Sequence, residues 1–324
     1  MQIGFPLLTL FCSAFLVLSP GDAEKSPPVD AMGQDPPGMK PHVFANGVIS
    51  TSARELNSVF SPDGDLFLFT RRDDSQTYRI METRKSPNGW SAPSVTPFTS
   101  EHPAVDPAFS WDGKRVFFGS GRPGTLGDSD IWVVDLSSDG GWGEPQNLGR
   151  PVNTTGNENH ASPASDGTLY FHSGGHQGLG ESDIFVATMS AESYSDPVNL
   201  GPAVNSSASD FDPFVAPDQS FILFSSTREG GSGGGDLHIS FRTKGGGWTK
   251  AANLGPEINT SETDYCPKIT PDGRFLFYTS RSTGGGDIYW VDARILDRYR
   301  PTTPWTSRSA QPPKIPSSTS RSGP

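Results

Sequence analysis

The stretch that decides the fold reads PKITPDGRFLFYTS, Pro267–Ser280, in which a polar Asp-Gly turn separates two apolar runs. Four earlier stretches repeat this order: SVFSPDGDLFLFT (Ser58–Thr70), PAFSWDGKRVFFGS (Pro107–Ser120), ASPASDGTLYFHS (Ala161–Ser173) and PFVAPDQSFILFSS (Pro213–Ser226). Their turn aspartates are, by subtraction, 49, 54, 52 and 54 residues apart: Asp63, Asp112, Asp166, Asp218 and Asp272. A β-type repeat of this length indicates a propeller, a solenoid or an array.

Each repeat carries four strand signals. In the third repeat they are ASPAS, TLYFHS, DIFVATM and the segment around PVNLG, and the first two flank the Asp166-Gly167 turn. Asp-Gly between apolar runs is a hairpin signal because glycine tolerates positive φ. Below, the four strands are called A to D in chain order.

The two ends of the repeat array complete one another. The chain opens with a lone strand-D segment, HVFANGVIS (His42–Ser50), whereas the fifth repeat has strands A, B and C but no clear strand D. If the N-terminal strand completes the last blade, the ring closes and both free sheet edges disappear. The prediction is therefore an all-β fold: a five-bladed β-propeller of four-stranded antiparallel blades, closed by the N-terminal strand pairing into the last blade. Trp90, Trp142 and Trp248 recur at one repeat position and are expected to pack between blades.

Composition agrees with this fold and excludes some partners. The chain has 37 Gly and 30 Pro, and only 33% of its residues are hydrophobic, which suits short strands and tight turns. A net charge of −11 argues against nucleic acid, which needs a basic surface. We expect a monomer.

The N-terminus has the features of an export signal. Residues 4–18 are an apolar run, too short for a typical membrane span, and Gly21 and Ala23 suit a cleavage after residue 23. The predicted organisation is a signal peptide (1–23), a Pro-rich linker (24–40), the β-propeller (41–300) and a disordered tail rich in Pro, Ser, Thr and Arg (301–324). The mature chain is expected to be periplasmic or secreted, without a membrane span. An uncleaved N-terminal anchor is the alternative.

Cleavage would leave Cys266 as the single cysteine, which excludes an intramolecular disulfide. It lies in a strand with alternating apolar residues, and a small buried core residue is the preferred interpretation over a reactive thiol.

Candidate site residues gather where strand A begins. Strand A lines the central channel of a propeller, and the D–A and B–C loops open on the same face. Positions two apart along a strand share a side, so the residues eight and six before each turn Asp should meet at the channel mouth. The acidic and His members are Glu55, Asp106, Glu158, His160, Asp210, Asp212 and Asp264. The B–C loops add Arg122, His176, Arg228 and Arg281, and His172 ends a strand B.

Three interpretations of this face stay open. The acidic groups can be structural, accepting backbone N–H groups and pairing with the loop arginines. They can bind a cation, a basic peptide or a sugar; a divalent cation is the one cofactor considered, since hard cations need several oxygens. They can also catalyse glycoside cleavage, with Glu158, His160 and Asp212 as the residues involved.

Two other recurring polar positions are expected to fix turns. The strand-C aspartates Asp130, Asp183, Asp236 and Asp287 follow Gly-rich loops but lead into strands, so no helix N-terminus is available for a phosphate. Asn153, Asn205 and Asn259 match the N-glycosylation pattern, yet their recurrence at one repeat position favours a turn preference.

The strings SPDG, NLGPEINT and GGGDIYWVD resemble the TolB-like, WD-type β-propeller repeat of exported bacterial proteins, over nearly all of residues 41–300. The resemblance implies a non-catalytic protein-binding or scaffolding module of the cell envelope, with an envelope or extracellular protein as partner. The alternative that it leaves open is a carbohydrate-active enzyme, either a polysaccharide lyase or a glycosidase.

Overall fold

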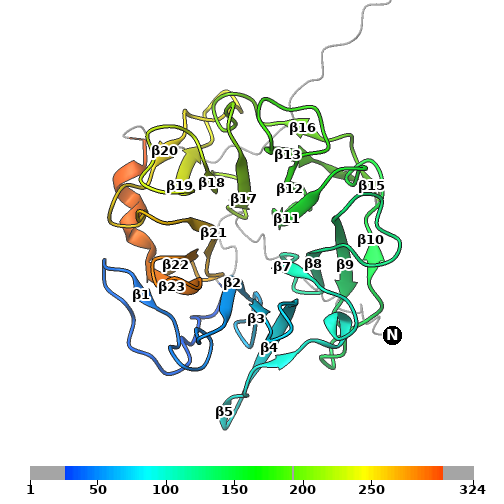
Figure 1. The fold of residues 1–324 in the computed structure, drawn as a ribbon, viewed down its shortest axis with the longest axis vertical. Coiled ribbons are helices and arrows are strands. Elements are labelled where there is room, and N and C mark those ends of the chain that lie inside the picture. Colours follow the sequence, from blue (N-terminus) through cyan, green and yellow to red (C-terminus); the bar gives the residue numbers. More distant parts are fainter. Residues whose placement is uncertain (1–25, 192, 302–324) are drawn as a thin grey trace, which may run out of the picture.

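The computed structural model describes residues 26–191 and 193–301. Five sheets, the blades, surround a central axis (Figure 1). The predicted signal peptide and nearly all of the predicted tail lie outside the described residues. Across the described ranges, no helix combines the length and the apolar character needed to cross a membrane.

Strands A, B and C of the blades follow the predicted order. The innermost strands, which carry the label nearest the axis in Figure 1, are β2 (Arg54–Phe60), β7 (Val105–Phe109), β11 (Glu158–Pro163), β17 (Asp210–Val215) and β21 (Asp264–Ile269). The second strands are β3 (Leu66–Arg72), β8 (Arg115–Ser120), β12 (Leu169–Ser173), β18 (Phe221–Ser226) and β22 (Phe275–Ser280). The third strands are β4 (Tyr78–Ser86), β9 (Asp130–Asp135), β13 (Asp183–Ala187), β19 (Asp236–Phe241) and β23 (Asp287–Asp292).

The outermost strands are two residues long. They are β6 (Ser94–Val95), β10 (Gln146–Asn147), β16 (Val198–Asn199), β20 (Ala252–Asn253) and β1 (His42–Val43). Two further short pairings lie at the rim: β5 (Gly89–Trp90) on β4, and β14 (Met189–Ser190) with β15 (Ser193–Tyr194).

The ring closes through its N-terminal strand, as predicted. His42 of β1 lies opposite Trp290 and Val43 opposite Tyr289 of β23, in antiparallel register. The fifth sheet therefore has the order β1-β23-β22-β21. Beyond β1 the predicted strand is a loop, but it still anchors the closure because Phe44 and Ile49 are fully buried.

The segment that precedes β1 also contacts the propeller. Val29, within the predicted 24–40 linker, is buried, and its N–H donates to Asp272 at 2.7 Å. Arg274 donates in turn to the Val29 carbonyl at 3.0 Å. The Pro-rich segment is therefore attached at Val29 to the A–B turn of the last blade.

Buried apolar side chains form one cluster at each boundary between blades, so most of the core is inter-blade. The recurring tryptophans contribute to it as predicted: Trp142 packs edge-on against Phe98 of the first blade, and Trp248 against Tyr170 of the third. Burial of each such ring contributes about 1.5–3 kcal/mol. A seven-residue 3₁₀ helix, η2 (Ala293–Tyr299), follows β23. It packs Ile295 and Leu296 against the cluster between the fourth and fifth blades.

Candidate functional site

Each innermost strand bulges at the position six residues before its turn Asp. The register with the second strand shifts there in all five blades. The bulged residues are buried and have left-handed backbones, although none is glycine: Asn57 (φ 38°), Asp106 (φ 60°), His160 (φ 54°), Asp212 (φ 52°) and Cys266 (φ 54°). We call these five residues the axial ring. A bulge redirects the side chain and is common next to functional sites.

The bulges are held by neighbouring blades. The Asp106 N–H donates to Thr70 Oγ1 (3.2 Å) and the Asn57 N–H to Thr279 Oγ1 (3.1 Å), and each acceptor lies on the second strand of the preceding blade. His172 occupies the same position in the third blade, and its Nδ1 accepts from the Asp212 N–H at 3.1 Å. The unusual histidine of strand B is therefore a substitute for threonine in this latch.

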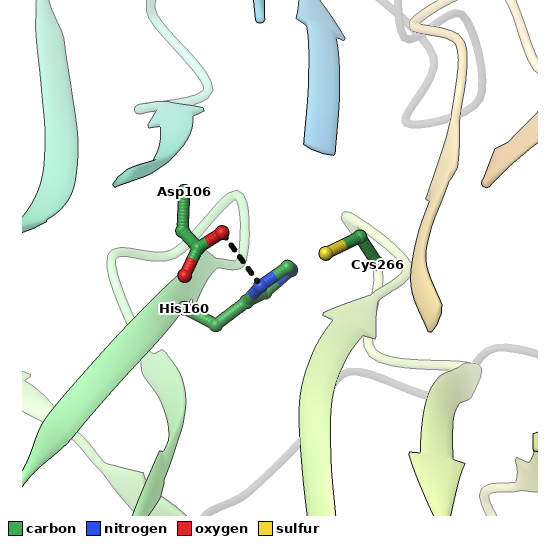
Figure 2. Close-up of side chains that lie close together, drawn as sticks. All are labelled: Asp106, His160 and Cys266. Atoms are coloured by element: carbon green, nitrogen blue, oxygen red, sulfur yellow. Dashed lines mark ion pairs between the residues drawn. The ribbon is translucent and has the colours of Figure 1, made fainter. Parts of the chain in front are cut away.

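The ring side chains meet one another across blade boundaries. His160 Nδ1 lies 3.2 Å from Asp212 Oδ1 and 3.7 Å from Asp106 Oδ1. The Cys266 thiol donates to Asp212 Oδ2 at 3.2 Å, and Asn57 Nδ2 donates to Asp106 Oδ1 at 3.5 Å. Figure 2 shows Asp106, His160 and Cys266 converging from three blades; one donor atom of each lies within 4.8 Å of the others.

His160 is an exception to the rule that buried polar groups are hydrogen-bonded. Its side chain is 0% exposed, and neither ring nitrogen has a hydrogen-bond partner within the described part of the chain. The 3.2 Å approach to Asp212 is short enough for a hydrogen bond but lacks the required direction. Leaving such a group unpaired costs about 1–3 kcal/mol.

Burial controls the electrostatics of the ring. It raises the pKa of both Asp106 and Asp212 and raises that of the Cys266 thiol well above its usual value. It lowers the pKa of His160 to about 3 and that of His172 to about 4, so both imidazoles are neutral at pH 7. Lys268, two residues after Cys266, is buried as well, and burial lowers its pKa to about 8.

A cavity of about 550 Å³ opens onto the ring. Asp106, Asp212 and Cys266 lie among its lining residues, together with the side chains of Leu56, Phe211, Tyr265 and Arg281. His172 of β12 also lines it, and the remaining lining residues come from D–A and B–C loops: Ser182, Ser209, Thr227, Gly234 and Thr263. The two loop sets therefore share one mouth, and the site is a pocket with aromatic walls above a polar, buried floor.

The predicted carboxylates that start strand A do not line this pocket. Glu158 accepts hydrogen bonds from the Thr154 N–H and hydroxyl (2.7 Å each) and from Ser173 Oγ (2.6 Å). The same contact to the residue four positions earlier recurs at Glu55, Asp210 and Asp264. All four residues are 0% exposed. They close the D–A loop onto strand A in each blade that has them.

Most of the predicted basic loop residues form hydrogen bonds with backbone carbonyl groups. Arg122, His176 and Arg228 bond the carbonyl of a residue fourteen positions before a turn Asp: Phe98 (3.0 Å), Val152 (2.9 Å) and Val204 (2.6 Å). Arg228 also pairs with Asp210 at 2.5 Å. Of the four predicted loop residues, Arg281 lines the cavity, with its guanidinium 5.3 Å from the centre of the Tyr265 ring.

The other recurring polar residues fix turns, in agreement with the sequence. Asp130 accepts from the Leu126 N–H and from Asn147 Nδ2. Asn205 is buried and bonds both the N–H and the carbonyl of Ile184 at 2.9 Å. The strand-C aspartates and these asparagines therefore fix loops in the blades that have them.

The predicted mouth residues thus separate into two groups. Asp106, His160 and Asp212 meet at the axis, whereas Glu55, Glu158, Asp210 and Asp264 lie in loop closures. Sequence reasoning missed Lys268, Phe211 and Tyr265, and it treated Cys266 as core. One signal in the sequence could have indicated the bulges. The residues six positions before the turn Asp include Asn, Asp and His, which are enriched at positive φ.

Comparison with known proteins gives structural likeness only. No family model matches the chain, and no curated protein matches it. Crystal structures with a related arrangement include TolB from Acinetobacter baumannii, with 17% identity over 76% of this chain and 53% of that one and a TM-score of 0.48. This chain therefore spans about half the length of that TolB.

Two other neighbours are an enzyme and a protein of unknown function. The α-L-arabinofuranosidase PaAbf62A from Podospora anserina shares 12% identity over 78% of this chain and 93% of its own, with a TM-score of 0.47. A protein of unknown function from Dyadobacter fermentans shares 14% identity over 80% and 84% of the two chains, with a TM-score of 0.48. At these identities the argument about function depends on the site itself.

Proposed function

We propose that this chain is an exported binding module that holds a segment of an envelope or extracellular protein in the mouth of its channel, without catalysing a reaction. The observation that carries the proposal is the pocket of about 550 Å³ between the D–A and B–C loops. Four strand-A carboxylates at this end are buried in loop closures, so they serve the scaffold.

The chemistry of the pocket suits a protein segment. Phe211 and Tyr265 offer aromatic surface, Leu56 offers aliphatic surface, and Arg281 is a charged donor beside them. Tyr and Arg are among the residues that contribute most binding energy at protein interfaces, especially when they surround a desolvated pocket. Loop hydroxyls at the rim, such as Ser209 and Thr227, can bond a peptide backbone.

A displayed random-peptide library, selected on the immobilised propeller, tests this proposal. Selected peptides are expected to bind Arg281→Glu and Phe211→Ala at least about tenfold more weakly than the unchanged protein, as loss of an interface anchor does. Matched controls lie on the exposed A–B turn of the second blade: Lys114→Glu repeats a charge reversal, and Trp111→Ala repeats the removal of an aromatic ring. Both controls should keep full binding.

Peptides that bind the mouth variants and the unchanged protein equally well would overturn the proposal, as would failure to select any peptide. Folding of each variant is checked first by its unfolding midpoint, so that lost binding is not mistaken for lost structure.

A carbohydrate-active enzyme is the second candidate, because two carboxyl groups, Asp106 and Asp212, reach the cavity and burial raises the pKa of each. Glycosidases need such a pair. Of the three residues expected in this alternative, Asp212 lines the cavity and His160 lies at the axis, whereas Glu158 is buried in a loop closure. Release of sugar from a panel of polysaccharides that disappears in Asp212→Asn would favour the enzyme over the binding module.

Export is part of the proposal and rests on the apolar run at residues 4–18 followed by small residues at 21 and 23. Mass spectrometry of the protein recovered from a bacterial periplasm or medium should find an N-terminus at Glu24. Recovery of the full-length chain from the cytoplasm alone would contradict export.

A further inference from the structure

The axial ring brings together side chains that a metal ion uses as ligands. A carboxylate, an imidazole and a thiol from three blades place donor atoms within 4.8 Å of one another (Figure 2). From this juxtaposition we infer that the ring binds one divalent transition-metal ion of the zinc class, through Asp106, His160 and Cys266, with Asp212 beside them as a further oxygen donor. The inference does not depend on the proposed partner-binding function.

The unpaired imidazole of His160 is the independent observation that points to a ligand. Its side chain is 0% exposed, both ring nitrogens lack a hydrogen-bond partner among the described residues, and the ring is directed at the other donors. A bound metal ion would take one nitrogen as a ligand and remove this deficit. Asn57 Oδ1, in the same ring, is likewise buried and unpaired.

The distances are close to those of a tetrahedral site. With metal–ligand bonds of about 2.0–2.3 Å, neighbouring donors in a zinc site are roughly 3.3–3.7 Å apart. His160 Nδ1 is 3.7 Å from Asp106 Oδ1 and 3.2 Å from Asp212 Oδ1, and Cys266 Sγ is 3.2 Å from Asp212 Oδ2. A small inward movement of Cys266 and Asp106 would complete the set.

The types of donor atom in the ring indicate which class of metal ion it would bind. Calcium and magnesium prefer oxygen ligands, six or more of them in typical sites. A thiol and an imidazole beside carboxylates suit zinc and its neighbours in the first transition series. The site is therefore chemically different from the hard-cation site expected at the strand-A carboxylates, which are already occupied by backbone and hydroxyl donors.

A divalent ion would also offset most of the formal negative charge of the ring. Two carboxylates and a thiolate carry three negative charges, and a divalent cation carries two positive ones. Buried charges are stable when they are paired or coordinate a metal. On binding, the metal–sulfur bond replaces the S–H bond of Cys266, and the thiol proton passes to solvent.

Access and rigidity favour binding by the folded ring. Asp106, Asp212 and Cys266 line the cavity, so an ion can reach them from the mouth. Each ligand stands on a bulge, and the bulge N–H groups of Asp106 and Asp212 donate hydrogen bonds to the neighbouring blade. An ion would join the second, third, fourth and fifth blades at their common axis.

The test is metal content and Co²⁺ spectroscopy on the intact chain. The protein is unfolded in denaturant that contains EDTA to remove bound metal. It is then refolded with excess Zn²⁺ and dialysed. We expect about one Zn²⁺ per chain, and less than about a tenth of that in His160→Asn and Cys266→Asn, because each variant removes a direct ligand. Asparagine is chosen because Asn57 already occupies the equivalent bulge at φ 38°, so both variants should fold.

His238→Asn is the matched control, since His238 is buried on β19 outside the ring. It should keep the full Zn²⁺ content. With Co²⁺, the unchanged protein should show a thiolate-to-metal charge-transfer band that is absent in Cys266→Asn. Zn²⁺ content no higher than that of His160→Asn would overturn the inference, and so would bound Co²⁺ without a thiolate band.

Discussion

His160 Nδ1 lies 3.2 Å from Asp212 Oδ1, on the neighbouring blade, yet the imidazole has no hydrogen-bond partner among the residues that the structure describes. Two buried polar groups are thus in contact across a blade boundary without satisfying one another. The carboxylates two residues earlier on strand A are used for loop closure in four of the five blades. The unsatisfied contact at the axis therefore marks the part of strand A that serves something besides folding.

The strand-A carboxylates should affect stability. Glu158→Gln replaces an acceptor of three hydrogen bonds with an amide, one end of which is a donor facing other donors. The free energy of unfolding should fall by about 1–3 kcal/mol. Urea denaturation measures it, with the exposed Glu144→Gln as the control. A Glu158→Gln protein as stable as the unchanged one would refute the loop-closure role.

The hydrogen bond from the Asp212 N–H to His172 tests whether equivalent positions in different blades have the same role. Thr70 and Thr279 accept a bulge N–H at the position that His172 occupies in the third blade. His172→Thr should therefore keep the stability to within about 1 kcal/mol, whereas His172→Leu should lose about 1–3 kcal/mol because the Asp212 N–H is left unpaired. Equal losses in the two variants, measured by chemical denaturation, would show that the acceptor is unimportant.

Closure of the ring should depend on Phe44. Its ring is fully buried and packs against Phe60 and Phe67 of the first blade and Phe277 and Trp290 of the last. Phe44→Ala should lower the free energy of unfolding by about 3–5 kcal/mol. Val48→Ala, four residues later and 53% exposed, is the control and should change it little. A small loss at Phe44 would contradict closure by this segment.

Acid should destabilise the fold partly through His238. Burial lowers its pKa below the ordinary value of 6.5, so the unfolded chain takes up a proton that the folded one does not. Its contribution is fully present above pH 6.5 and is lost as the pH falls from there toward the lowered value. His238→Gln, measured in EDTA at about pH 7.5 and about pH 5.5, should lose less stability than the unchanged protein. An equal or larger loss would contradict the assignment.

The sequence alone was enough to predict the five blades, the closure by β1 and the shared face of two loop sets. Each depends on turn chemistry and alternation repeated five times, and such local signals survive in one sequence. The Asp63-to-Asp272 spacing even aligned Ile49, Val152, Val204 and Ile258, all of which are buried.

The axial ring could be predicted only in part. Alternation along an unbroken strand would place Glu158 and His160 on the same side. The bulge at His160 breaks the register, so His160 lies at the axis whereas Glu158 closes the D–A loop. No glycine marks the bulge. Cys266 belongs to the site through its contact with Asp212 of the fourth blade, which spacing within one repeat cannot reveal.

The most direct test of the account is anomalous diffraction at the zinc absorption edge from crystals of the protein refolded with Zn²⁺. The account predicts a single strong peak on the propeller axis, bonded to Asp106, a ring nitrogen of His160 and Cys266. An axis without a peak, with water bonded to both His160 and Asp212 instead, would contradict it.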